Sequence, residues 1–196
     1  MRIIGGKYKG RDLLPPPQEA TTRPITGLVK KSLFGMLGED MSGMVVADLY
    51  CGTGTLGIEA LSRGADRCYF AECDRAVVER LRRNLQTVGA VDQATVWTGD
   101  VESDLAAWLA GVPGRIDTVF VDPPYASTRK WDWQAVAQSV FAPLAGALAD
   151  NGIVMLRACD DVIIPDRVGP LAVLRRRQYG NMLLALLGKQ GEDKNI

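Results

Sequence analysis

The chain has 196 residues, 23 basic and 23 acidic side chains and no histidine. Its length predicts one domain with a small appendage, and a composition of 47% hydrophobic and 23% charged residues indicates a globular protein with a sizeable core. The absence of histidine excludes Ser-His-Asp and Cys-His catalysis, an imidazole general base and a histidine-ligated metal.

Residues 1–25 are predicted to form a basic N-terminal arm, followed by a single α/β domain over residues 26–196. Residues 1–14 predict a β-hairpin that turns at Gly5-Gly6. Residues 1–31 hold seven basic side chains against two acidic ones, a net charge of +5 that leaves −5 for the remainder. We expect this arm to contact a nucleic acid, with a solvated basic terminus as the alternative, and we expect deletion of residues 1–14 to change the melting temperature little.

The rest of the chain alternates between helices and strands. An amphipathic helix is predicted from Thr26 to about Gly38. Strands are predicted at 44–49, 67–71, 94–98, 116–121 and 152–157, with helices at 55–63, 75–88, 102–110 and 133–148. Apolar strands separated by helices are typical of a parallel, doubly wound sheet. Two last runs, Leu171–Arg176 and Met182–Leu187, predict an antiparallel hairpin at the C-terminal end.

Carboxylates and glycines follow the first three predicted strands, at the edge where such sheets bind ligands. The segment from Asp48 to Gly57 contains Gly-x-Gly-x-x-Gly, typical of a nucleotide-binding turn, but a carboxylate just before the glycines suits an ammonium group better than a pyrophosphate. Glu72 and Asp74 stand where a carboxylate accepts hydrogen bonds from ribose hydroxyls. Asp100 suits an adenine amino group or, as the alternative, a helix N-cap.

The fourth predicted strand ends in Asp122-Pro123-Pro124-Tyr125. Consecutive prolines restrict the backbone, so the Asp122 carboxylate and the Pro123 carbonyl can be held side by side as two acceptors. Two acceptors on the hydrogens of an exocyclic amine favour a nucleophilic nitrogen without any histidine. Tyr125 offers a flat surface on which an extruded base can stack.

These residues resemble the RsmD family, S-adenosylmethionine-dependent methyltransferases that modify the N2 amine of one guanine in 16S rRNA. The tetrapeptide at 122–125 is the mark of amino-directed methyltransferases. Other similar segments extend over nearly the whole chain, at 2–6, 10–11, 22–24, 33–37, 48–65 and 179–181. Two departures are Ile25, where the family usually has threonine, and Tyr-Cys-Gly-Thr-Gly at 50–54, where it commonly has Phe-Ala-Gly-Ser-Gly.

The resemblance implies a Rossmann-like class I methyltransferase fold, with a seven-stranded, mostly parallel sheet, a C-terminal antiparallel hairpin and an N-terminal β-hairpin arm. It places Asp48 near the methionine amino group, Glu72 on the ribose and Asp100 with Val101 at the adenine. The implied cofactor-binding residues are Asp48, Cys51, Gly52, Gly54, Glu72, Cys73, Asp100 and Val101. The implied catalytic residues are Asp122, Pro123, Pro124 and Tyr125. The implied RNA-binding residues are Arg2, Lys7, Lys9, Arg11, Arg23, Tyr125 and Tyr179.

The implied reaction is attack of the N2 nitrogen of guanine 966 on the sulfonium methyl group of S-adenosylmethionine. The implied partner is 16S rRNA within the assembled or assembling 30S subunit, bound by a monomer without a metal. The four cysteines form no Cys-x-x-Cys pair, and the longest apolar run, residues 182–187, is far below the ~18 residues of a membrane span. We therefore expect a cytoplasmic protein that is neither exported nor membrane-bound.

Several other functions fit parts of the sequence. An NAD-dependent oxidoreductase explains the glycines but gives Asp48 and Asp122 no role. A carbon-5 pyrimidine methyltransferase needs a nucleophilic cysteine, for which Cys159 is the candidate, although a small buried thiol is its ordinary interpretation. A DNA adenine-N6 or protein glutamine-N5 methyltransferase presents a similar nitrogen to the same tetrapeptide, and a non-catalytic RNA-binding assembly factor needs only the basic arm.

Overall fold

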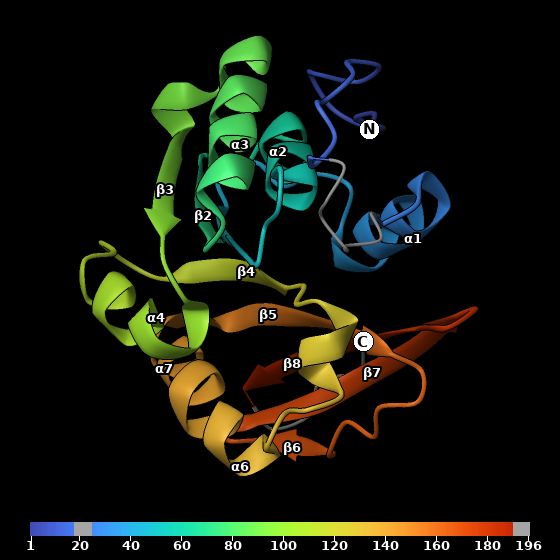
Figure 1. Ribbon diagram of the computed structural model, residues 1–196, viewed down its shortest axis with the longest axis vertical. Helices are drawn as coiled ribbons and strands as arrows, with labels where there is room; N and C mark the ends of the chain where they lie inside the picture. The colour runs from blue at the N-terminus through green and yellow to red at the C-terminus, as the bar shows by residue number, and fades with distance from the viewer. Residues whose placement is uncertain (18–24, 190–196) are drawn as a thin grey trace. The chain divides into compact units, whose positions relative to one another are not determined.

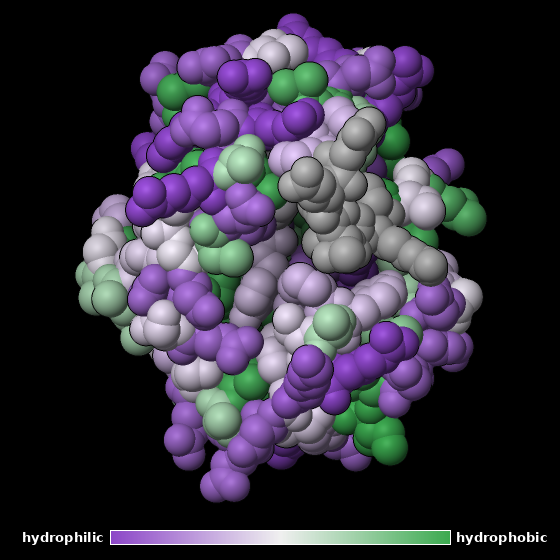
Figure 2. Space-filling model, viewed as in Figure 1, coloured by the Kyte–Doolittle hydropathy of each residue, from purple (hydrophilic) through white to green (hydrophobic). Residues whose placement is uncertain are grey.

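The computed structural model describes residues 1–17 and 25–189 and divides into two compact units, Met1–Val101 and the chain from Glu102 on (Figure 1). The predicted RNA-binding residue Arg23 lies outside the described residues. None of the described helices is long and apolar enough to cross a membrane. On the face drawn in Figure 2, hydrophobic residues occur as small areas among hydrophilic ones.

The first unit contains a three-stranded parallel sheet in the order β3-β2-β1. Its strands are β1 (Val45–Leu49), β2 (Arg67–Glu72) and β3 (Ala94–Thr98). Its helices are α1 (Gly27–Leu37), α2 (Thr55–Ser62), α3 (Arg75–Val88) and the short η1 (Val91–Gln93). Figure 1 shows α2 and α3 beside β2. These bounds agree with the prediction within a few residues, and the parallel order brings the carboxyl ends of the three strands to one edge.

Local sequence explains where these helices begin and end. The Thr26 hydroxyl accepts from the Val29 amide at the start of α1, and the Asp74 carboxylate accepts from the Ala76 amide at the start of α3. The chain leaves α3 at Gly89, whose φ of 75° is costly for other residues. Helix α3 buries Val77, Leu81 and other apolar residues on one face, which fixes it against the sheet.

The second unit contains five strands in the order β4-β5-β8-β7-β6. These are β4 (Ile116–Val121), β5 (Leu148–Cys159), β6 (Arg167–Val168), β7 (Leu171–Tyr179) and β8 (Met182–Lys189). The β4–β5 pair is parallel, and the remaining pairs are antiparallel, so the predicted C-terminal hairpin is confirmed. The described residues thus hold eight strands where seven were predicted, and the two-residue β6 is a segment that apolar patterning did not indicate.

The single helix predicted over 133–148 is wrong in detail. The second unit's helices are α4 (Val101–Ala110), which begins at the unit boundary, α5 (Tyr125–Thr128), α6 (Trp133–Val136), the π-helical turn η2 (Ala137–Phe141) and α7 (Ala142–Ala147). Pro143 stands in the first turn of α7, where its missing N–H breaks the regular helical ladder. The wider π turn precedes it, and β5 starts at Leu148, four residues earlier than expected.

The N-terminal arm is not the predicted β-hairpin. Its ends are joined by a single antiparallel bridge between Arg2 and Asp12, and residues 5–10 form turns. Gly5 and Gly6 do not form a hairpin turn but dock on the end of α2, where the Lys7 amide donates to the Ser62 carbonyl at 2.7 Å. A Cβ on Gly6 would lie 1.7 Å from the Ser62 carbonyl oxygen. The glycines are therefore needed for close approach of two backbones.

The arm is packed into the first unit. Ile3 and Leu13 are 1% and 3% exposed, and the Ile4 amide donates to the Glu59 carboxylate at 2.9 Å. The Leu14 amide donates to the Asn84 side chain on α3 at 2.8 Å. This burial is at odds with the expectation that the arm can be removed without loss of stability, because its removal would expose apolar surface and unpair buried polar groups.

Two glycine substitutions test this docking. Gly6 and Gly10 have φ angles of 71° and 86°, so alanine at either site incurs the left-handed backbone cost of about 1–2 kcal/mol. Only Gly6→Ala also forces the arm away from Ser62, since nothing lies within 4 Å of a Cβ on Gly10. We expect denaturant unfolding to show Gly6→Ala less stable than Gly10→Ala by about 1–3 kcal/mol. Equal free energies of unfolding would show that the arm is not docked.

Candidate active site

A glycine loop joins β1 to α2 in the first unit. Tyr50, Gly52 and Gly54 all have positive φ, at 57°, 55° and 85°, so three left-handed residues turn the chain sharply. A Cβ on Gly54 would lie 2.4 Å from the Leu81 side chain, whereas a Cβ on Gly52 would meet nothing within 4 Å. Gly54 is thus required for packing, and Gly52 leaves open space above the turn, where a ligand can approach the backbone.

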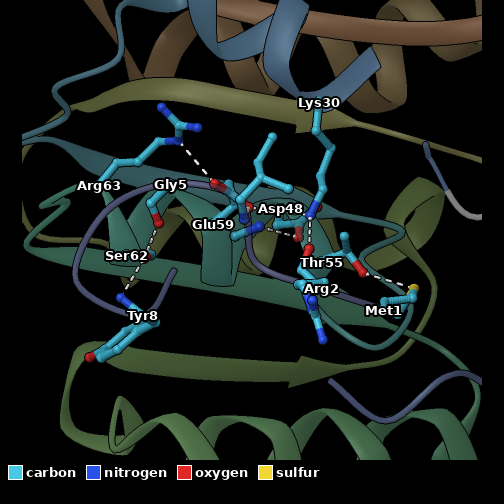
Figure 3. A network of polar contacts seen from close by, with 12 residues as sticks. Met1, Arg2, Gly5, Tyr8, Lys30, Asp48, Thr55, Glu59, Ser62 and Arg63 are labelled. Carbon is cyan, nitrogen blue, oxygen red and sulfur yellow. Dashed lines mark hydrogen bonds and ion pairs between the residues drawn. The ribbon is translucent and has the colours of Figure 1, made fainter. Parts of the chain in front are cut away.

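Asp48 anchors this loop from the end of β1. It is 1% exposed, and its Oδ2 accepts from the Gly57 amide in the first turn of α2 at 2.8 Å (Figure 3). A carboxylate at a helix N-terminus is favoured by the unpaired amides and the helix dipole. The sequence predicted a direct contact with a ligand's ammonium group, and the structure adds a role in fixing the turn.

Glu72 joins the ends of the three strands. Its Oε2 accepts from the Gly52 amide at 3.0 Å and its Oε1 from the Asp74 amide at 2.9 Å. Its backbone carbonyl accepts from the Gly99 amide at 3.2 Å, directly before Asp100. The structure therefore brings the glycine loop, Glu72 and the Asp100 segment together at one edge, as predicted.

The predicted cofactor-site cysteines lie at the same edge. The Cys51 amide donates to the Ala71 carbonyl at 2.9 Å, and Cys51 itself is buried. Burial raises the pKa of the Cys51 thiol well above its ordinary value, and the Asp48 and Glu72 carboxylates raise it further. Cys73 is exposed, 3.5 Å from Glu72 Oε1, and its pKa is raised by partial burial and by that carboxylate.

The second unit holds the Asp122–Tyr125 segment at the end of β4. Asp122 forms an ion pair with Arg157, whose side chain is 7% exposed. The Arg157 guanidinium also lies 5.4 Å from the centre of the Tyr125 ring. Burial raises the pKa of Asp122 to about 6, although the Arg157 charge opposes that rise. The segment thus presents a carboxylate whose pKa lies below neutral pH, and one guanidinium contacts both this carboxylate and an aromatic ring.

The two prolines shape the backbone after Asp122. Pro124 is the N-cap of α5, and its carbonyl accepts from the Ser127 amide at 2.9 Å. The Pro124 carbonyl therefore serves α5, and the predicted second acceptor is the carbonyl of Pro123. Tyr179 ends β7 and is half-buried, paired in register with Met182, which also pairs with Cys159 at the end of β5.

Sequence reasoning missed Arg157. An arginine within the apolar run of β5 was the available signal, because a buried guanidinium requires a partner. Cys159, the candidate nucleophile of the carbon-5 alternative, is 2% exposed, and its sulfur contacts Arg129 Nη2 at 3.1 Å. Cys159, Asp160 and Asp161 bring three ligand-type atoms within 4.8 Å of one another, and Arg129 already pairs with Asp161 there.

The described RNA-binding candidates of the arm, Arg2, Lys7, Lys9 and Arg11, have different neighbours. Arg2 forms an exposed ion pair with Asp12, which offsets its charge. Lys7 and Arg11 both lie over the Tyr8 ring and bond to Gln93 and to the Thr87 carbonyl. Lys9 instead lines a groove beside α1.

Comparison with known proteins places the chain in a family. A family model described as "Conserved hypothetical protein 95" matches residues 1–188. The chain belongs to this family, the RsmD family of methyltransferases. YlbH of Bacillus subtilis, which carries a provisional rRNA methyltransferase name, is 34% identical over 191 residues, 97% of this chain and 100% of that protein. The ribosomal RNA small subunit methyltransferase D of Escherichia coli K12 is 40% identical over 127 residues, 64% of this chain and 60% of that protein.

Solved structures agree with this membership. The structure of yhhF from Escherichia coli, provisionally named a methyltransferase, has a TM-score of 0.77 at 29% identity and covers 97% of this chain and 98% of its own. An RNA methyltransferase from Salinibacter ruber in complex with S-adenosyl-L-homocysteine shares the fold, with a TM-score of 0.60 at 18% identity over 88% of this chain and 98% of its own. These likenesses confirm the predicted class I methyltransferase fold.

Thiol labelling tests the geometry of the glycine-loop edge. Cys73 is exposed, whereas Cys51, Cys68 and Cys159 are buried. We expect limited alkylation of the native protein, followed by peptide mass spectrometry, to modify Cys73 first, and slowly, because its pKa is raised. The urea-unfolded chain, as control, should label at all four cysteines. Native labelling of Cys51 as fast as Cys73 would contradict this structure of the loop.

Proposed function

We propose that the protein transfers a methyl group from S-adenosylmethionine to the N2 amine of guanine 966 in 16S rRNA. The observation that carries this proposal is the partly buried Asp122 carboxylate at the end of β4, paired with an Arg157 guanidinium that also lies 5.4 Å from the centre of the Tyr125 ring. The names of the Bacillus subtilis and Escherichia coli relatives support rRNA as the substrate. By the same resemblance we infer a cytoplasmic monomer that acts on the assembled or assembling 30S subunit.

The residues of the first unit fit the cofactor. Glu72 lies beside the open space at Gly52, where its carboxylate can accept hydrogen bonds from the ribose hydroxyls. Asp100 and Val101 follow β3 at the same edge, where they can bind the adenine. Asp48, already fixed to α2, contributes negative charge near the methionine amino group. When bound, S-adenosylmethionine supplies an electrophilic methyl group. S-Adenosylhomocysteine should then slow the alkylation of Cys73.

The residues of the second unit fit the acceptor. The Asp122 carboxylate and the Pro123 carbonyl accept the two N2 hydrogens of guanine, which turns the nitrogen lone pair out of conjugation. The Tyr125 ring stacks on the base and holds it for in-line attack. The bound cofactor would supply the methyl group to this nitrogen and would leave as S-adenosylhomocysteine. Asp122 then takes the proton that the methylated nitrogen releases.

A groove in the first unit fits the RNA backbone. It has a volume of about 770 Å³ between the arm and α1, and its charged lining is Lys9, Lys31 and Arg63 against one carboxylate, Glu39. Lys9 and Lys31 are exposed, so their ammonium groups can reach phosphates. Leu28, 76% exposed at the same groove, offers apolar contact to a base. The proposed RNA-binding surface therefore includes residues of α1 as well as residues of the predicted basic arm.

Substitution of Asp122 tests the chemistry. Asp122→Asn removes the ionised acceptor but keeps the side-chain shape, so we expect the methylation rate to fall on the order of a hundredfold, while the affinity for S-adenosylmethionine changes little. The rate is measured by transfer of labelled methyl to 30S subunits, followed by mass spectrometry of the nucleosides. Loss of cofactor affinity equal to the loss of rate, or appearance of a product other than N2-methylguanosine, would contradict the proposal.

Salt dependence tests the groove. For single strands, the slope of log affinity against log salt changes by about 0.7 for each lost phosphate contact. We expect the double substitution Lys9→Gln and Lys31→Gln, which removes two phosphate contacts, to flatten this slope by about 1.4, measured by fluorescence anisotropy with an rRNA fragment. The matched control, Lys7→Gln with Arg11→Gln, removes the same charge from the Tyr8 cluster and should retain more of the slope. Equal slopes in the two double variants would refute a special role for the groove.

A further inference from the structure

Arg157 is a buried cation at the end of the β4–β5 pair. It is 6% exposed in the apolar strand β5. In the parallel register, Val121 of β4 pairs with Leu156 of β5, so Asp122 and Arg157 are the next residues on each strand. The backbone therefore sets the two side chains next to each other. A charge buried to this degree is retained only if it is paired, because its desolvation is costly.

One guanidinium contacts two groups of the proposed acceptor site. Its Nε forms the ion pair with Asp122 Oδ1, and its central carbon lies 5.4 Å from the centre of the Tyr125 ring. Arg157 itself is held on the other side of β5, where it pairs in register with Leu184 of β8. A displacement of this side chain would thus affect the carboxylate and the ring together.

We propose that Arg157 is the positioning residue of the acceptor site, which keeps Asp122 ionised and oriented and sets the plane of the Tyr125 ring. This inference rests on the proposed function of Asp122 as the acceptor for the target amine. Arg157 acts through its neighbours and needs no contact with the substrate. The planar guanidinium suits this double role, since it can pair with a carboxylate along its edge and approach a ring with its face.

Within the second unit, Arg157 is the charge that favours the ionised form of Asp122. Arg129, a cation that contacts the Cys159 sulfur at the end of β5, is paired with Asp161 at 2.9 Å. Burial alone raises the pKa of Asp122, and Arg157 is the charge that opposes this rise. Without it, the pKa of the carboxyl would rise further, and a protonated carboxyl can donate, but not accept, at the oxygen that carries the proton.

The test compares pH–rate profiles of the wild type, Arg157→Gln and Arg157→Lys. The wild-type rate should fall as the pH decreases below about 6, the pKa of Asp122. We expect Arg157→Gln to shift this fall upward by about one pH unit or more, with a kcat at pH 7 lower by at least about tenfold and an unchanged KM for S-adenosylmethionine. Arg157→Lys should keep the wild-type position of the fall, because it keeps the charge, but with a reduced kcat because the planar contact with Tyr125 is lost.

A purely structural role predicts a different result. In that case both variants lower the melting temperature or the active fraction but leave the position of the pH fall unchanged, which would overturn the proposal. If Arg157→Gln does not fold, a shifted fall in the folded Arg157→Lys variant would equally overturn it. Carbon-13 NMR titration of the Asp122 carboxyl measures the pKa of Asp122 in the wild type and in the Arg157 variants without any substrate. It therefore separates failure of this inference from failure of the proposed function, which methyl transfer by the wild type tests.

Discussion

The buried carboxylate of Glu59 organises the first unit. It lies on α2 without exposure and accepts from three segments: the Ile4 amide of the arm, Lys30 of α1 and Arg63 at the end of its own helix. Figure 3 labels Glu59 with Lys30 and Arg63. Lys30 also donates to the Arg2 carbonyl at 2.7 Å, so the cation joins helix and arm. Burial lowers the pKa of Lys30, and Glu59 opposes that change, so each charge requires the other.

This network connects to the glycine loop through one rigid element. Helix α2 carries Glu59 near its end and begins directly after the loop, where its Gly57 amide binds Asp48. The arm and α1 therefore hold the same helix whose first turn shapes the predicted cofactor edge. A short helix of this kind has little stability by itself, so its position depends on these tertiary contacts. The basic arm is thus part of the construction of the methyltransferase domain, besides any contact with RNA.

Much of the fold and the site was predictable because both depend on local patterns. Alternating apolar strands and helices gave the architecture, and glycines or carboxylates directly after β1, β2 and β3 do meet at one edge around Glu72. The hairpin at Gly5-Gly6 was wrong, since two glycines permit a turn and a close backbone approach equally well, and only the position of Ser62 decides between them. Arg157 was missed because it lies 35 residues after Asp122 in the chain, and only the register of β4 and β5 brings the two together.

Both carboxylate oxygens of Glu72 already accept backbone hydrogen bonds from the chain itself, one from each side of the edge. The Glu72 carboxylate is therefore held in place by two backbone amides of the protein before any ligand binds. The directions of its remaining lone pairs are set by these two hydrogen bonds. A nucleoside that binds there meets an ordered surface, so little conformational entropy is lost on the protein side. In the proposed cofactor-binding role, the spacing of the two ribose hydroxyls, and not only their polarity, would decide which nucleoside this edge accepts.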